Sequence, residues 1–355
     1  MSTAKTNMST AKNAVEFDNV SIVFGNEPEV ALPLMDAGQE RPEIQAATGQ
    51  VLGVHNCSLD VGEGEILVLM GLSGSGKSTL LRAANGLNSV ARGEVRVNDG
   101  QGMVDITKLS PAGLRQIRQQ RVTMVFQQFG LLPWRTVQDN VGFGLEVAGV
   151  KPKEIKERVA AQLDLVGLSG WADRNVGELS GGMQQRVGLA RAFTTEAPIL
   201  LMDEPFSALD PLIRNHLQDE LLELQANLKR TIIFVSHDLD EAFKLGDRIA
   251  IMEGGRIVQC GTPRDIYSAP ASDYVAEFVD HMNPLGVLTA MDVMRPKTYA
   301  SSTADAIDGN MKVSDVLERL CKASAPLLVQ QNGQVVGEVS SESVIAKLAN
   351  SNGDT

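Results

Sequence analysis

The chain has 355 residues, of which 43% are hydrophobic and 21% charged, the composition of a globular protein with roughly two or three domains. A mostly disordered chain is excluded, because disorder requires low hydrophobicity together with high net charge. No apolar run approaches the roughly 18 residues that cross a bilayer, and the N-terminus lacks a signal-peptide pattern. We therefore expect the chain to remain in the cytoplasm.

The net charge of −12 argues against DNA or RNA as a partner, because nucleic-acid binding normally requires a basic face. The three cysteines lie far apart, with no CxxC spacing: Cys57, Cys260 and Cys321. This spacing indicates reduced thiols rather than a zinc site or a disulfide framework.

The start of the chain predicts a tail followed by an interrupted strand. Residues 1–14 are mostly small and polar and repeat the sequence Met-Ser-Thr-Ala-Lys, so we expect a disordered tail. Both Met1 and Met8 are compatible with the start of translation. After the apolar run Val20–Phe24, a segment rich in proline and glutamate follows. We expect residues from about 25 to 53 to form an insertion on the surface.

Four short apolar runs predict buried β-strands: residues 66–70, 122–126, 199–202 and 231–235. Their apolar residues do not alternate with polar ones, which is typical of parallel strands covered by helices on both faces. Each run ends at a glycine or at polar residues, and parallel sheets bind ligands at the carboxyl ends of their strands. The sequence therefore predicts an α/β fold with a functional site where these strands end.

Two further regions surround this core. Helices expected at 153–165 and 182–194 indicate a helical subdomain over about 128–197. After residue 284 the pattern changes, and residues 286–355 predict a small appendage of the β-α-β-β-α type. Its expected elements are a helix at 313–323, strands at 326–330 and 335–339 joined by a turn at Asn332-Gly333, and a last helix capped by Ser341.

The segment from Gly71 to Ser78 fits the phosphate-loop pattern GxxxxGK[ST], after a predicted strand and before a helical pattern. Its glycines let successive backbone N–H groups turn towards one anion, and the positive end of the helix adds to the attraction. Lys77 is unfavourable at a helix N-terminus unless a polyphosphate neutralises it, and the Ser78 hydroxyl can bind Mg²⁺. The expected nucleotide-binding residues are Gly71, Leu72, Ser73, Gly74, Ser75, Gly76, Lys77, Ser78 and Thr79.

Two carboxylates, Asp203 and Glu204, follow another predicted strand. Beside a phosphate loop they indicate a metal ligand and a group that orients the attacking water, and we assign these roles to Asp203 and Glu204 respectively. Taken alone, the pair is also compatible with a solvated strand end.

A third phosphate-binding element follows Leu179, where Ser180 can cap a helix and Gly181 and Gly182 expose backbone N–H groups. One nucleotide does not need two glycine-rich anion sites from the same chain. Two copies facing head to tail would resolve this, with each such signature closing over the phosphate loop of the other copy.

Together these motifs resemble the ATP-binding cassette (ABC) ATPases. The phosphate loop, Gln127, the signature, the Asp203-Glu204 strand, the loop Ser207–Asp210 and His237 occur in the order of that family. The resemblance covers residues 15–285 and implies a P-loop NTPase fold, with a RecA-like core and a helical subdomain, that binds ATP and Mg²⁺.

The resemblance also implies a role for each matching residue. The catalytic residues would be Glu204, His237 and Gln127, and the metal ion would be bound by Ser78, Gln127 and Asp203. The ATP of the partner copy would be contacted by Ser180, Gly181 and Gly182. Asp210 would act across the dimer interface. From the residues alone, His237 is equally an ordinary surface histidine. The aromatic residue that stacks on adenine has no counterpart at the usual spacing, where Val54 and His55 stand. Phe24 is a candidate if the insertion loops out; otherwise it packs in the core.

Within the family the chain looks like the importer ATPases for quaternary amines, on residues 70–79 and 206–214 and on the insertion ending at Thr48-Gly49. Residues 129–136 look most like the choline-type members. The resemblance implies an ATP-hydrolysing subunit that powers import of choline, with glycine betaine or proline as the alternative substrate. The implied partners are a second copy, two membrane permease subunits docking near residues 127–135 and a separate substrate-binding protein, with no nucleic acid.

We expect a peripheral position on the cytoplasmic face of the inner membrane. Residues 286–355 fit one degenerate copy of the cystathionine-β-synthase modules that such ATPases often carry in tandem. Two other functions stay open: a soluble cassette ATPase acting in translation or DNA repair, and a nucleotide-binding regulator without turnover. The first usually carries a second cassette or a long coiled-coil insertion, which this sequence lacks, and the complete phosphate loop with Asp203-Glu204 argues against the second.

Overall fold

The computed structural model describes residues 12–128, 130–280, 284–296, 305–323 and 325–350. The chain divides into two compact units, Met1–His237 with Ala250–Val258 and Asp238–Ile249 with Gln259–Thr355. The expected boundary at residue 285 therefore lies inside the second unit. Most of the expected N-terminal tail lies outside the described residues, but the first strand begins at Asn13, so the expected end of the tail at residue 14 is wrong by two residues.

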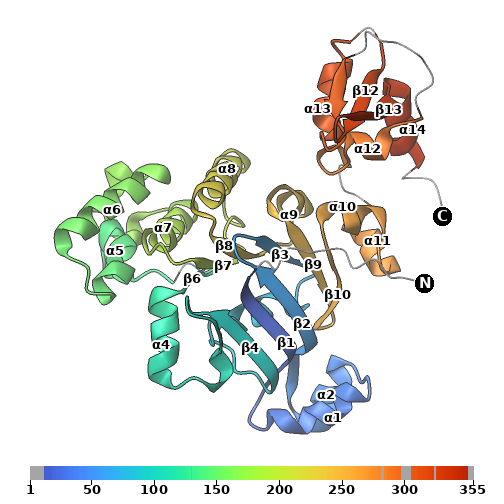
Figure 1. The fold of residues 1–355 in the computed structure, drawn as a ribbon. Helices are drawn as coiled ribbons and strands as arrows, with labels where there is room; N and C mark the ends of the chain where they lie inside the picture. The colour runs from blue at the N-terminus through green and yellow to red at the C-terminus, as the bar shows by residue number, and fades with distance from the viewer. Residues whose placement is uncertain (1–11, 129, 281–283, 297–304, 324, 351–355) are drawn as a thin grey trace. The chain divides into compact units, whose positions relative to one another are not determined.

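The core of the first unit is a six-stranded sheet in the order β10-β9-β3-β8-β7-β6 (Figure 1). The four strands predicted from the sequence are neighbours in it and run parallel, which confirms the α/β fold. Every residue of β3, β7 and β8 is buried, as their uninterrupted apolar sequences require. The strands are β3 Ile66–Met70, β6 Val122–Val125, β7 Ile199–Asp203, β8 Thr231–Val235, β9 Arg248–Glu253 and β10 Arg256–Gly261.

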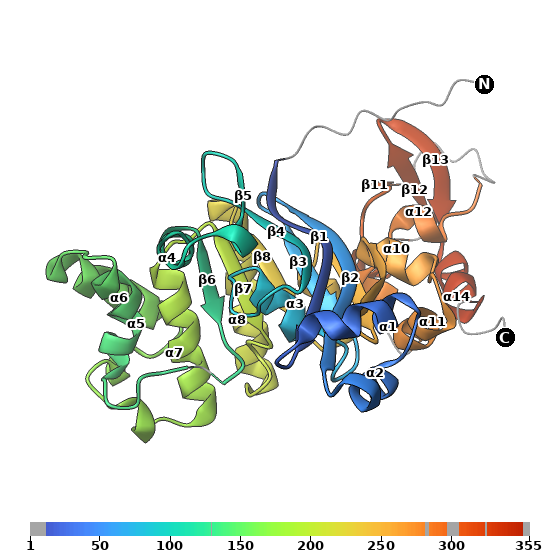
Figure 2. The ribbon, with the colours of Figure 1, turned by 90° about the horizontal axis from the view of Figure 1, so that it is seen from below.

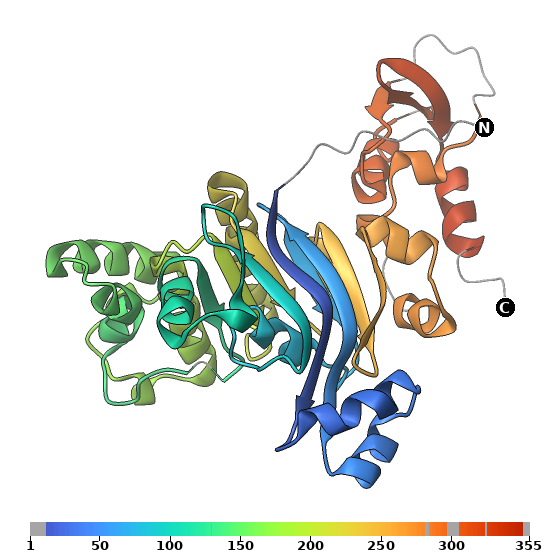
Figure 3. The same ribbon diagram turned by 60° about the horizontal axis from the view of Figure 1, so that its bottom comes forward.

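A second, four-stranded sheet has the order β2-β1-β4-β5, with antiparallel pairing throughout (Figure 3). Its strands are β1 Asn13–Phe24, β2 Val51–Gly62, β4 Arg92–Asn98 and β5 Met103–Asp105. The last residue of β1, Phe24, is paired with the first residue of β2, Val51, so the insertion comprises residues 25–50.

The insertion is more ordered than its proline- and glutamate-rich sequence suggests. It forms the helices η1 Pro28–Ala31, α1 Leu32–Asp36 and α2 Arg41–Thr48, which lie against the end of the β1–β2 pair (Figure 2). A small core joins them to the two strands, with the buried side chains Val23, Ala31, Met35, Ile44 and Leu52.

Polar contacts of Asp36 also hold the insertion to the four-stranded sheet. Both carboxylate oxygens of Asp36 accept hydrogen bonds from Arg92 in β4, at 2.7 and 2.8 Å, and His55 Nε2 lies 3.3 Å from the same carboxylate. These contacts, with Arg92 as the largest cause, lower the pKa of Asp36 to about 2.

The helical subdomain consists of α5, α6 and α7, grouped beside the edge strand β6 (Figure 1). The predicted helices 153–165 and 182–194 correspond to α6 and α7, and each begins one residue earlier than predicted. The helices of the first unit beyond the insertion are α3 Lys77–Ala83, η2 Ile106–Lys108, α4 Pro111–Gln120, α5 Val137–Val147, α6 Pro152–Leu165, η3 Ser169–Trp171, η4 Val176–Glu178, α7 Gly181–Thr194 and α8 Pro211–Leu228. Within the described residues, no helix is long and apolar enough to span a bilayer.

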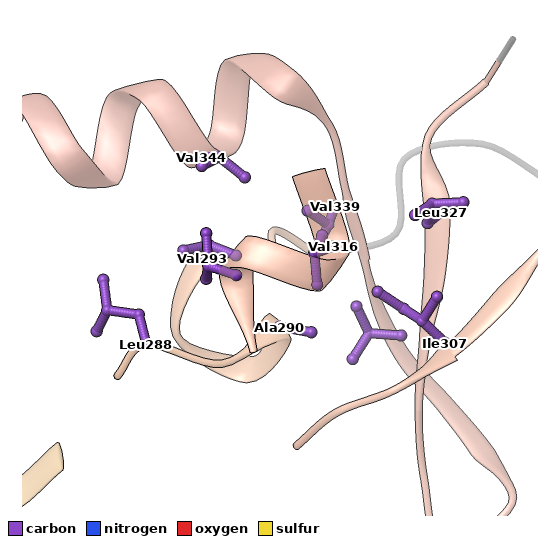
Figure 4. Close-up of a cluster of buried hydrophobic side chains, with 10 residues drawn as sticks. Leu288, Ala290, Val293, Ile307, Val316, Leu327, Val339 and Val344 are labelled. Atoms are coloured by element: carbon purple, nitrogen blue, oxygen red, sulfur yellow. The ribbon is translucent and has the colours of Figure 1, made fainter. Parts of the chain in front are cut away.

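The second unit ends in a small three-stranded sheet of order β11-β12-β13. It has its own hydrophobic core, in which the helices and strands bury Val293, Ile307, Val316, Leu327 and Val344 (Figure 4). Tyr267, which lies before residue 285, packs against the same core. Its elements are α9 Leu239–Leu245, α10 Pro263–Ser268, α11 Asp273–Val279, η5 Pro284–Gly286, α12 Ala290–Val293, β11 Ala306–Asp308, α13 Val313–Leu320, β12 Leu327–Gln331, β13 Gln334–Val339 and α14 Ser341–Asn350.

The predicted β-α-β-β-α order is confirmed in β11 to α14. Asn332 and Gly333 form the predicted turn, with φ of 51° and 78°, as a type I′ hairpin requires. The predicted helix cap at Ser341 is wrong by one residue, because the hydroxyl of Ser340 accepts the hydrogen bond from the Ser343 N–H while Ser341 is already helical.

Replacing Met35 by alanine tests the insertion core. Met35 has no exposed surface, so Met35→Ala should lower the free energy of unfolding of the first unit by about 2–5 kcal/mol, measured by urea denaturation followed by circular dichroism. Val30→Ala is the control, because Val30 is 51% exposed and its loss should change stability by less than about 0.5 kcal/mol. Equal effects of the two changes would contradict a contribution of this core.

Candidate functional site

The phosphate-loop sequence joins β3 to α3, as predicted. Gly71 has a φ of 139° and Gly76 a φ of 103°, a region that only glycine enters readily. A Cβ atom on Gly71 would lie 2.1 Å from the carbonyl oxygen of Met252, and one on Gly76 would lie 2.8 Å from that of Gly53. Both glycines are therefore required by close backbone approach as well as by conformation.

The loop opens onto a cleft of about 290 Å³. Six of the nine residues predicted to bind the nucleotide line it, and so do two predicted catalytic residues: Ser73, Gly74, Gly76, Lys77, Ser78, Thr79, Gln127 and Glu204. The remaining wall comes from the N-terminal part of the chain, through Phe24, Arg41 and residues 51–53.

Lys77 is buried at the base of this cleft. Its side chain folds back over the loop, where Nζ donates hydrogen bonds to the carbonyl oxygens of Gly71 at 2.7 Å and Leu72 at 3.0 Å. Burial lowers the pKa of the Lys77 ammonium, and the carboxylates of Glu204 and Asp203 oppose that shift. The loop thus holds a cation whose charge a polyphosphate can neutralise.

The Asp203 carboxylate at the end of β7 has no exposed surface. Its Oδ1 accepts a hydrogen bond from the Ser78 hydroxyl at 2.6 Å, and its Oδ2 accepts one from Arg82 Nη2 at 2.9 Å. The paired oxygens of Ser78 and Asp203 suit Mg²⁺, which prefers hard oxygen ligands and usually takes its remaining ligands from water and substrate phosphates. In the described part of the chain, no group of three or more His, Cys, Asp or Glu side chains could hold a metal without such help.

The other two predicted catalytic residues, Gln127 and His237, both lie next to the Glu204 carboxylate. Its Oε2 accepts a hydrogen bond from Gln127 Nε2 at 3.2 Å and lies 3.4 Å from His237 Nδ1. Glu204 itself has a φ of 48°, an uncommon value for a residue with a side chain. The His237 side chain is 63% exposed, so it lies both at the surface and next to this carboxylate.

The signature lies at the start of α7 and, as predicted, Ser180 caps that helix by accepting a hydrogen bond from the Met183 N–H. Ser180, Gly181 and Gly182 are not among the residues that line the cleft. Asp210 does not line it either and caps α8, where its carboxylate accepts a hydrogen bond from the Ile213 N–H. None of these four predicted residues therefore lines the cleft of its own chain.

The sequence of the chain matches known proteins. A family model described as ABC transporter matches residues 54–207. The chain is 50% identical over 281 residues to the glycine betaine/proline betaine transport system ATP-binding protein ProV of Escherichia coli K12, covering 79% of this chain and 69% of that protein. It is 44% identical over 320 residues to the trimethylamine N-oxide transport system ATP-binding protein TmoW of Ruegeria pomeroyi, covering 90% and 92%.

The chain belongs to the ATP-binding subunits of ABC transporters. This ABC ATPase also resembles the solved dimeric cassette MJ0796 in a post-hydrolysis state bound to ADP and Pi. The TM-score is 0.61 and the sequence identity 30%, over 70% of this chain and 99% of that one. The family identifies the chain as an ATPase whose hydrolysis is coupled to transport.

In this ABC ATPase the insertion does loop out, between the paired residues Phe24 and Val51. Phe24 is 43% exposed and lines the cleft, which favours stacking on a base over packing in the core. Val54 and His55, at the usual spacing, are buried and present no surface to an adenine.

Two further residues of the ABC ATPase site escaped the sequence analysis. Arg82 pairs with Asp203, and its position one helical turn after Ser78 is the signal that could have revealed it. Gln185 in α7 donates a hydrogen bond to the Glu204 carbonyl at 3.5 Å and accepts one from the Ala208 N–H at 3.2 Å. Gln185 thereby links the signature helix to the segment that follows Glu204. No local sequence pattern predicts this contact.

Replacing Glu204 by glutamine tests its assignment. The amide keeps the size of the side chain but loses the charge, so Glu204→Gln should retain ATP binding and lower ATP turnover by about 10²–10⁴-fold, measured by phosphate release and by calorimetric titration. Glu157→Gln, at an exposed carboxylate of α6, is the matched control and should keep full turnover. Wild-type turnover in Glu204→Gln would contradict the assignment.

Proposed function

We propose that this ABC ATPase powers the import of glycine betaine or a closely related methylated amine through a membrane permease. The relatives described above are named for transport of glycine betaine, proline betaine and trimethylamine N-oxide. Those names favour glycine betaine, the alternative of the sequence analysis, over its first candidate, choline. The observation that carries the ATPase part is the convergence of Gln127 and His237 on Glu204, beside the Ser78–Asp203 pair.

In this proposal the cleft binds ATP with its phosphates over the loop and Lys77. Ser78 and Asp203 would hold Mg²⁺, which when bound neutralises charge on the β- and γ-phosphates. Glu204 polarises the attacking water, and Gln127 and His237 fix the orientation of the Glu204 carboxylate and reach the γ-phosphate. Phe24 stacks on the adenine, because it is the exposed aromatic side chain in the wall of the cleft.

We propose further that two copies act as a head-to-tail dimer. The support is that the signature residues do not line the cleft of their own chain, while Ser180 and Gly181 are exposed and free to face a second copy. In the dimer each signature would bind the γ-phosphate of the partner's ATP, and Asp210 would lie at the interface.

Mixing two inactive variants tests the dimer. Ser180→Arg should place bulk and charge against the partner's nucleotide, and Lys77→Ala should disable the loop that carries it, so each variant alone should lose ATP hydrolysis. Mixed dimers contain one doubly damaged site and one intact site, so the mixture should recover up to about a quarter of wild-type turnover if one intact site suffices. If the two sites hydrolyse ATP only together, the mixture will not recover turnover. Nucleotide trapping is therefore measured alongside, because it detects occupied sites without hydrolysis. Normal hydrolysis by Ser180→Arg would contradict the contact in trans.

The loop after Gln127 is the proposed docking site for the permease. Trp134 is 74% exposed. Two residues before it, the backbone of Leu132 is bound by the buried side chain of Asn140, which accepts a hydrogen bond from the Leu132 N–H at 2.7 Å and donates one to the Leu132 carbonyl at 3.1 Å. Large aromatic residues are enriched at protein interfaces. Phe129 lies outside the described residues.

The remaining partners and the location follow from the import role. Two permease subunits, a separate substrate-binding protein and a peripheral position on the cytoplasmic face of the inner membrane belong to this proposal, as does the interpretation of residues 286–355 as one degenerate module of the cystathionine-β-synthase type.

Uptake by the complete transporter tests the substrate. With ATP supplied on the side of the ATPase, proteoliposomes should accumulate glycine betaine at least tenfold faster than choline, with proline and trimethylamine N-oxide assayed in parallel. Vesicles carrying the Glu204→Gln subunit are the control and should show no ATP-dependent uptake. Faster uptake of choline would overturn the substrate assignment, and ATP hydrolysis without uptake of any of the four would overturn the assignment to this class of substrate.

A further inference from the structure

Arg41, the first residue of α2 in the insertion, reaches into the wall of the nucleotide cleft. Its Nη1 donates a hydrogen bond to the carbonyl oxygen of Gly74 in the phosphate loop, and its Nη2 donates one to that of Gly53 in β2 at 2.6 Å. One guanidinium therefore joins three segments: the insertion, the phosphate loop and β2. Burial lowers the pKa of this guanidinium, but an arginine stays charged in proteins.

The insertion holds Arg41 in this place. Glu40 and Glu43 form a capping box at the start of α2, which fixes the helix N-terminus where Arg41 lies. Ile44, one turn further, is fully buried in the insertion core. These two contacts fix the start of α2, so the guanidinium is held in position before any nucleotide enters.

The bond to Gly74 acts on the conformation of the phosphate loop. The peptide unit between Gly74 and Ser75 is engaged at both ends, because its N–H donates to the Leu72 carbonyl at 3.1 Å and its carbonyl accepts from Arg41. Gly74 has a φ of 80°, and glycine pays the largest entropy on being fixed in one conformation. Bonds from a charged donor are stronger than those from a neutral one, so Arg41 restrains the loop at Gly74.

We propose that Arg41 is a positioning residue for nucleotide binding, which holds the phosphate loop ready for the phosphates and makes the insertion part of the ATP site. The proposal rests on the proposed function of the cleft as the ATP site. Because a phosphate loop cradles the α- and β-phosphates, Arg41 acts on ATP and ADP alike. It takes no part in water activation, which the residues around Glu204 perform.

Calorimetric titration of the full chain with ADP and with a non-hydrolysable ATP analogue tests this role. Arg41→Ala should weaken binding of both nucleotides by about tenfold and raise the KM for ATP similarly, while kcat at saturating ATP stays within about twofold of wild type. Arg41→Lys keeps one donor for the two carbonyl oxygens and should recover affinity to within about threefold. This partial rescue also keeps the test valid if the alanine variant folds poorly.

Arg92→Ala is the matched control, because Arg92 anchors the same insertion through Asp36 but does not line the cleft. It should leave both affinities within about twofold of wild type. Wild-type affinity in Arg41→Ala, an equal loss in Arg92→Ala, or a loss confined to the ATP analogue would each overturn the proposal. A wild-type chain that binds neither nucleotide would instead overturn the proposed function.

Discussion

The burial of the Asp203 carboxylate is the constraint on which the geometry of the site depends. A carboxylate with no exposed surface is strongly destabilising unless both oxygens find partners. Ser78 and Arg82 supply them, and both belong to α3, the helix that follows the phosphate loop. The loop and the end of β7 are thereby fixed to one another, at the place where we propose that the phosphates and Mg²⁺ bind.

Glu204, the next residue, connects the buried Asp203 carboxylate to the proposed catalytic side chains. Its positive φ turns the chain sharply at the end of β7, and its carbonyl is held by hydrogen bonds from Gln185 and from the Ser207 hydroxyl at 3.1 Å. Unusual backbone conformations persist where the surroundings determine them, often at active sites. Here the turn brings the carboxylate to Gln127 and His237, which come from the segments after two other strands.

Local sequence patterns predicted the parts of the molecule that are determined locally. The apolar runs gave β3 and β8 to the residue, because a strand buried on both faces requires uninterrupted apolar sequence. The phosphate loop was predictable because its glycines are required by backbone geometry. The contact of Gln185 with the Glu204 carbonyl was not, since the two residues lie 19 apart and no periodicity relates them. Arg82 and its partner Asp203 lie 121 residues apart, and the signal for their pairing is the position of Arg82 one helical turn after Ser78. The insertion helices were missed because the few apolar residues that bury them, such as Met35 and Ile44, complete their core only with side chains from β1 and β2.

The pairing of Phe24 with Val51 means that the chain leaves the four-stranded sheet and returns to it at the same point. A hairpin of this kind can be closed by a turn of only two residues, and the entropy of closing a longer connection grows slowly with its length. The pairing of β1 with β2 therefore does not require a particular length of the segment between residues 25 and 50. With Arg41 in the role proposed above, a change of sequence within this segment would alter nucleotide affinity while every residue of the phosphate loop and of the proposed catalytic group stays the same.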